Sequence, residues 1–182
     1  MSASGGYRIS VDSVEVVLEG LHAVLYTENG RVLSYHKSFS DFMFHKSRSE
    51  EYWCDQAAQH RSLAKTCFHV MKARLKFNIA NIPSSFILDR DNHALSAQVA
   101  RNIPDILQYA CRNWHHHLCF DVATDSINNY GLLVGFIQLR AIFWIEAMNL
   151  LGSVGQCDEI LQTASRWSAR VGKWDASVSS TS

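Results

Sequence analysis

The chain lacks the compositional extremes that mark several classes of protein. Its 182 residues include 17 basic and 17 acidic side chains, so the formal net charge is zero. A protein that neutralises a phosphate backbone normally has a basic surplus, and we therefore expect no nucleic-acid partner. With 47% apolar and 19% charged residues, the composition also excludes a disordered or fibrous chain. Only 2 prolines are present, so helices meet few forced breaks.

Signals for secretion, disulfides and membrane insertion are also missing. The 5 cysteines are widely spaced without a CxxC pair, which indicates a reducing compartment. Residues 1–6 contain no apolar stretch of the kind that secretion requires. The longest apolar run, 132–152, contains Arg140 and Glu146, which a lone membrane span would tolerate poorly. We therefore predict a cytoplasmic protein with no membrane partner, in which this run forms a helix buried between other helices.

A complete catalytic motif is missing as well. The phosphate-binding pattern GxxxxGK(S/T) does not occur, because the only Gly-Lys pair, Gly172-Lys173, is followed by Trp174. Nucleophilic catalysis needs a Cys or Ser, a His and an orienting carboxylate, and no local signature places such a set together. We predict that the chain alone is not an enzyme and has no catalytic residues.

A run of histidines invites a metal interpretation. His115, His116 and His117 would fan out by about 100° each on a helix and cannot converge on one ion. Cys111, His115 and Cys119 share a face but span about 12 Å, too far for one zinc ion with ligands at about 2.0–2.3 Å. We predict no metal site, with Cys111 packed in the core and the histidines solvated.

Among the motifs that are present, the clearest predicts a β-hairpin. Asn29-Gly30 lies between two apolar-rich runs, 22–27 and 31–36, and a type I′ turn needs positive φ at both central residues. We expect Ser38 or Ser40 to cap a short helix after the hairpin. A helix with Val14 and Val17 on one face precedes the hairpin, and this order is that of the end of a winged-helix unit.

The helix before the hairpin argues against DNA recognition. A recognition helix carries Arg, Lys, Asn or Gln at its exposed positions, whereas residues 14–19 are acidic and apolar. Farther along, Ala64, Phe68 and Met71 recur at helical spacing, and Pro104 is expected at the first position of another helix.

The predicted fold class is mainly α: a short winged-helix remnant with one β-hairpin, followed by an α-helical bundle or superhelix. The predicted boundaries are a disordered N-terminus over 1–9, a winged-helix end over 10–45, a helical domain over 56–174 and a disordered tail over 175–182.

Five segments in order resemble one family. His36-Lys-Ser-Phe-Ser-Asp-Phe42 resembles the H-x-S-F-x-(D/E)-F signature near the end of the winged-helix domain in NACHT-type signal-transduction NTPases. These are relatives of NOD-like receptors that are abundant in mushroom-forming fungi. Further matches to the same proteins lie at Leu21–Tyr26, Cys67–Ile79, Tyr109–Leu118 and Phe143–Leu151. The resemblance covers roughly residues 10–174.

The resemblance implies a regulatory role. In such receptors an ATPase module lies upstream, and WD or ankyrin-type repeats usually lie downstream. The winged-helix histidine approaches the β-phosphate of bound ADP and helps to hold the inactive state, a role that falls on His36. Such a contact is a hydrogen bond from a ring N–H, stronger when the ring is protonated. Because this chain lacks the ATPase module, the role is conditional, and ADP or ATP would enter only through a NACHT module.

The leading hypothesis is therefore a non-catalytic regulatory or scaffold segment of a NACHT-type receptor. It would couple nucleotide state to sensor repeats by protein–protein or intramolecular docking, with the NACHT module and the repeats as partners. The alternative is a stand-alone helical adaptor with no nucleotide link. A hydrolase or metal-binding protein is the third possibility.

Overall fold

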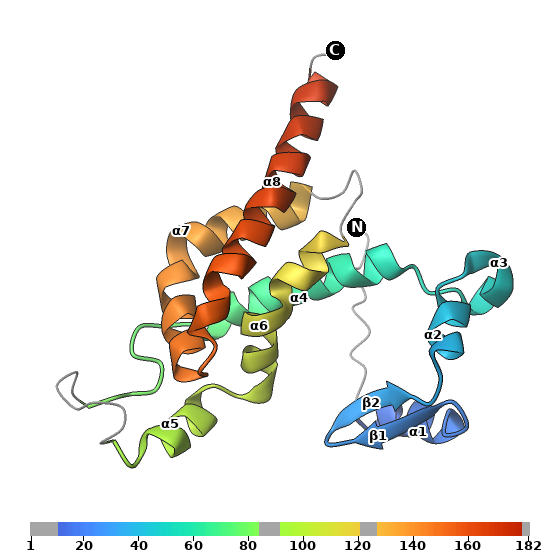
Figure 1. Cartoon of the computed structure of the whole chain (residues 1–182), viewed down its shortest axis with the longest axis horizontal. Helices are drawn as coiled ribbons and strands as arrows, with labels where there is room; N and C mark the ends of the chain where they lie inside the picture. The colour runs from blue at the N-terminus through green and yellow to red at the C-terminus, as the bar shows by residue number, and fades with distance from the viewer. Residues whose placement is uncertain (1–10, 84–91, 121–126, 180–182) are drawn as a thin grey trace, which may run out of the picture. The chain divides into compact units, whose positions relative to one another are not determined.

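The computed structural model describes the backbone of residues 11–83, 92–120 and 127–179, and the side chains of 14–83, 92–120 and 128–171. The chain divides into two compact units, 1–55 and 56–182 (Figure 1). The predicted disordered N-terminus, 1–9, lies outside the described residues. As the sequence predicted, the protein is mainly helical, with one hairpin followed by a helical bundle.

The first unit consists of short elements. They are α1 (Val11–Gly20), β1 (Leu25–Glu28), β2 (Arg31–Ser34), α2 (Lys37–Met43), α3 (Lys46–Ser49) and a 3-10 turn, η1 (Glu50–Tyr52). Strands β1 and β2 pair antiparallel, from Leu25 opposite Ser34 to Glu28 opposite Arg31. This register leaves a two-residue loop in which Asn29 has a φ of 51° and Gly30 a φ of 71°. The hairpin prediction is confirmed, because both residues adopt the positive φ that a type I′ turn requires.

The first unit contains no buried apolar side chain among its described residues. Val14 and Val17, which were expected to form the inner face of the first helix, are 43% and 58% exposed. Tyr35 and Tyr52 are each 64% exposed. Among the described residues of this unit, the hydrogen-bonded backbone is therefore not supported by a hydrophobic core.

The second unit holds the core. Its elements are α4 (Gln56–Arg74), α5 (Leu95–Asn102), α6 (Asp105–Cys119), α7 (Ile127–Leu150), a 3-10 turn, η3 (Val154–Gln156), and α8 (Cys157–Ser179). Helix α4 packs on α6 and α7, and α8 packs on α6 and α7. Three fully buried tryptophans, Trp114, Trp144 and Trp167, dominate the space between these helices. The Trp144 indole N–H donates to the Cys111 carbonyl at 2.9 Å, so the buried donor is satisfied.

Helix ends in this unit differ in two places from the sequence prediction. Pro104 is the N-cap of α6 rather than its first helical residue. Its extended backbone leads into the helix, and the Pro104 carbonyl accepts the N–H groups of Leu107 and Gln108. The tail predicted from residue 175 is helical as far as Ser179, because α8 extends to that residue.

Helix α7 is less buried than the sequence suggested. Its buried side chains, such as Leu133, Phe136 and Trp144, recur at helical spacing and face α4, α6 and α8. On another face Leu139 and Ile142 are 69% and 72% exposed. The prediction of a helix buried between other helices is therefore wrong for that face. Asn128–Leu150 is the one helix in the described part that is long and apolar enough to cross a bilayer.

Candidate functional site

The predicted site residue, His36, lies where β2 gives way to α2. Its backbone is extended, with φ −143° and ψ 141°, and it occupies the N-cap position of α2. Ring atom Nδ1 accepts the Ser38 backbone N–H at 3.1 Å and lies 2.9 Å from the Ser38 hydroxyl oxygen. A serine was the predicted cap. The cap is instead the histidine itself, because its side chain reaches the free N–H of the first turn.

This capping contact determines which ring nitrogen is available. A nitrogen that accepts a backbone N–H carries no proton, so in the neutral ring the proton of His36 is on Nε2. Within the described residues Nε2 has no hydrogen-bond partner, and the side chain is exposed. His36 can therefore donate one hydrogen bond to an anion while it keeps its cap. The charge-assisted form expected from sequence requires a proton on Nδ1 and would break the cap.

A histidine cluster lies where α4 packs against α6. His117 is only 6% exposed, its Nδ1 lies 2.8 Å from Nδ1 of His60, and its Nε2 lies 2.9 Å from the Tyr109 hydroxyl. The His60 ring stacks on Phe120, with ring centroids 4.2 Å apart. One proton must lie between the two Nδ1 atoms if they are hydrogen-bonded. Burial lowers the pKa of both His60 and His117 and keeps the pair neutral near pH 7.

The sequence did not predict this cluster. The prediction that His117 is solvated is wrong, because its ring is packed between α4 and α6. His60 is 57 positions away in the chain, and no local spacing links the two residues. The local signal for burial is that His117 lies three residues beyond Trp114 and seven beyond Ala110, both buried side chains of α6.

The neighbouring groups do not supply a nucleophile. Burial raises the pKa of the Cys67 thiol to about 11 and that of the Cys111 thiol to about 12, so both stay protonated at neutral pH. Burial and the nearby His116 and His117 rings lower the pKa of His115 to about 4. The raised pKa values of Cys67 and Cys111 fit thiols that pack in the core rather than thiols that attack a substrate.

The structure does not gather metal ligands among its described residues. No group of three or more His, Cys, Asp or Glu side chains there could hold an ion. Cys111 is fully buried, as expected, and Cys119 is exposed at the end of α6.

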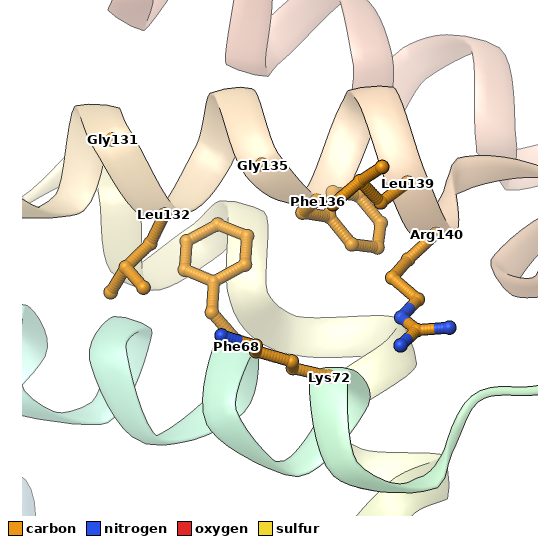
Figure 2. A pocket seen from close by; sticks show the side chains of 8 residues that line it. All are labelled: Phe68, Lys72, Gly131, Leu132, Gly135, Phe136, Leu139 and Arg140. Atoms are coloured by element: carbon orange, nitrogen blue, oxygen red, sulfur yellow. The ribbon is translucent and has the colours of Figure 1, made fainter.

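A pocket of about 150 Å³ lies between α4 and α7 (Figure 2). Its apolar wall is formed by Phe68 from α4 and by Leu132, Phe136 and Leu139 from α7. Figure 2 shows the Phe68 ring standing between the two helices, close to Leu132 and Phe136. A space of this order accommodates a group of about the size of benzene.

Two cationic side chains complete the lining of this pocket. Lys72 comes from α4 and Arg140 from α7; in Figure 2 the Lys72 side chain runs beneath the Phe68 ring, and the Arg140 side chain extends from α7 toward α4. Neither forms an ion pair with a carboxylate among the described residues of the second unit, although the Arg140 guanidinium lies 5.9 Å from the Phe143 ring centre. The pocket thus combines an apolar surface with positive charge at its edge, a combination that suits an amphipathic anion.

No family model, curated protein or solved structure matches the chain. Function is therefore inferred from the described side chains and from the resemblance of the segment at residues 36–42.

Proposed function

We propose that the chain is a non-catalytic regulatory segment of a NACHT-type signalling receptor that works in the cytoplasm by docking to protein. The observation that carries this proposal is the geometry of His36. Its Nδ1 is engaged by the first turn of α2, and its Nε2 remains exposed as a single donor. A donor held on a fixed helix cap suits contact with a phosphate oxygen that another module presents.

The exposed apolar side chains of the first unit support docking to protein. Val16, Val17 and Tyr35 are 67%, 58% and 64% exposed, and no apolar side chain described in this unit is buried. Exposed apolar residues gathered on one small unit favour an interaction surface. A partner module that covers them would provide the hydrophobic burial that the unit lacks.

The proposal that the segment is not itself an enzyme rests on what His36 can do alone, on a missing motif and on the chemistry of two buried thiols. One histidine donor cannot hold a nucleotide, and a phosphate loop is missing from the sequence. The buried thiols of Cys67 and Cys111 have raised pKa values and are poor nucleophiles.

Co-expression with a NACHT ATPase module tests the proposal, with ADP retained on the purified complex as the readout. The wild-type chain should bind the module and slow ADP loss. His36→Ala should speed that loss. His36→Asn is the sharper variant, because asparagine caps helices well but cannot place a ring N–H at the position of Nε2. We expect it to keep α2 folded and still lose ADP retention.

The outcomes separate the alternatives. Unchanged ADP retention in the His36→Asn complex would remove the phosphate role from His36. Absence of any complex would favour the stand-alone helical adaptor. A rise in melting temperature of the isolated chain on adding magnesium and ADP or ATP, or measurable phosphate release, would overturn the non-enzyme assignment.

A further inference from the structure

One face of α7 presents apolar side chains that no other described residue of the second unit covers. Gly131, Gly135, Leu139 and Ile142 follow one another at spacings of four, four and three, and therefore lie on one side of the helix. A side chain placed on either glycine would meet no atom within 4 Å, so the surface above them is open. Leu139 and Ile142 stand out beyond them, 69% and 72% exposed. We call this surface, together with the pocket beside it, the α7 groove.

Positive charge lies along one edge of the α7 groove. Lys72 and Arg140 line the pocket, whereas none of its lining residues is acidic. The nearest carboxylate along α7, Glu146, already accepts the backbone N–H groups of Asn78 and Ile79, each at 3.2 Å. The two cations are thus left without an anionic partner among the described residues of the second unit, and a bound carboxylate would supply one.

We infer that the α7 groove binds an amphipathic helix of a partner protein, and that this helix carries carboxylates beside its apolar stripe. The apolar residues of that helix would cover Leu139 and Ile142 and place one side chain in the pocket against Phe68. Its carboxylates would pair with Lys72 and Arg140. This inference rests on the proposed function, since it assigns the chemistry of one protein that the regulatory segment docks.

The dimensions of the surface favour a helix over other occupants. From Gly131 to Ile142 the face extends about 17 Å along the axis, or about three turns of a helix laid beside it. The glycines allow a partner backbone to approach closely there, while the pocket accepts a single side chain. A small ligand in the pocket would leave Leu139 and Ile142 uncovered, and a flat lipid surface would leave the pocket unfilled. A groove for an amphipathic helix uses all of these features.

A charge-swap selection tests the inference. The full chain is used to select from a displayed library of amphipathic helices that share one apolar stripe and vary among Glu, Gln and Lys at four flanking positions. The wild-type chain should enrich glutamate over lysine about tenfold at two or more of these positions. The double variant Lys72→Glu/Arg140→Glu should enrich lysine instead, since each repulsive pair is replaced by an attractive one. Arg101→Glu on α5 is the matched control and should keep the glutamate preference.

The apolar half of the surface is tested with the helix that the selection yields. Leu139→Ser/Ile142→Ser should weaken its binding by at least about tenfold in fluorescence anisotropy. Because both side chains are more than two-thirds exposed, the far-ultraviolet circular dichroism and melting temperature should stay close to wild type. If the double variant does not fold, the single variant Leu139→Gln takes its place, and it should weaken binding without unfolding the chain.

Several results would overturn the inference. Enrichment without a charge preference, or a preference that Lys72→Glu/Arg140→Glu leaves unchanged, would exclude the cationic edge as the recognition element. Dimerisation that Leu139→Ser abolishes would identify a second copy as the occupant. Binding to phosphatidylcholine vesicles containing phosphatidylserine that depends on Leu139 would identify a membrane surface. The chain could also form a complex with a NACHT module in every α7 variant, with ADP retention still lowered by His36→Asn. That result would contradict this inference but not the proposed function.

Discussion

At the scale of single residues, Glu146 is a charged side chain whose geometry serves folding. It lies on α7, and its two oxygens accept the backbone N–H groups of Asn78 and Ile79, which follow α4. Asn78 has a φ of 49°, and its side-chain oxygen accepts the Ile82 N–H at 2.8 Å. The carboxylate therefore satisfies two backbone N–H groups at the start of a tight turn.

Substitution of Glu146 by glutamine should destabilise the second unit. Glutamine keeps one acceptor oxygen but places an NH₂ group against the second backbone N–H. The expected loss is about 1–3 kcal/mol in the free energy of unfolding, the cost of leaving a buried donor without a partner. Urea denaturation followed by tryptophan fluorescence measures it. Glu159→Gln, on the exposed first turn of α8, is the control and should cost less than about 1 kcal/mol. Equal effects of the two variants would contradict the assignment.

At the scale of elements, the end of α7 shows how a helix is stopped and tied to its neighbour. Gly152 has a φ of 66°, the Ser153 N–H donates to the Met148 carbonyl, and the Gly152 N–H donates to that of Asn149. This is the Schellman pattern of a helix terminus. Arg112 on α6 donates to the Leu151 carbonyl at 3.1 Å, which places a cation at the negative end of α7.

A matched pair of glycine variants should separate backbone strain from crowding at this terminus. A Cβ at Gly152 or at Gly155 would meet no atom within 4 Å, but only Gly152 has positive φ. Gly152→Ala should therefore lower the free energy of unfolding by about 1–2 kcal/mol through strain alone. Gly155→Ala should leave it unchanged or raise it by up to about 1 kcal/mol, because alanine restricts the unfolded chain. Thermal melting of both variants measures the difference, and a destabilised Gly155→Ala would refute it.

The histidine pair between α4 and α6 makes this packing sensitive to acid. Burial lowers the pKa of His60 and His117 below the ordinary value of 6.5. As the pH falls below 6.5 the unfolded chain takes up protons that the folded chain excludes, so the free energy of unfolding decreases. His115, with its pKa lowered to about 4, extends the same loss toward lower pH.

Variants in the pair should change the slope of stability against pH. Urea unfolding between about pH 7.5 and about pH 5 should show a shallower loss for His117→Gln than for wild type, because one group with a lowered pKa is gone. His69→Gln, an exposed histidine of α4, should keep the wild-type slope. A steeper slope for His117→Gln would mean that the ring is charged in the folded protein.

How much the sequence could predict depended on how local each feature is. The hairpin was predictable because Asn29 and Gly30 alone specify its turn. The histidine pair was not, because His60 and His117 meet only after α4 and α6 have packed. For α7, a continuous apolar run indicated burial on every side. The structure exposes Leu139 and Ile142, and average hydropathy cannot show which face of a helix finds a neighbour.

At the scale of the whole molecule, stability is unevenly distributed. Every buried apolar side chain among the described residues belongs to the second unit, from Ala64 to Trp167. The first unit has backbone hydrogen bonds in its hairpin and short helices but none of this burial. Since local opening is least costly where few apolar contacts are lost, the two units should open with different free energies.

Native-state hydrogen exchange of the full chain should reveal this difference. We expect amides of β1, β2 and α2 to exchange with little protection, and those of α6 and the buried half of α7 to approach the protection of global unfolding. A docked partner would cover the exposed apolar residues of the first unit, such as Val17 and Tyr35. The amides of the first unit should therefore become more protected from exchange in a complex with a NACHT module. Equal protection of β1 and α6 in the isolated chain would show that the first unit is already stabilised without a partner. The regulatory proposal would then have to rest on His36 alone.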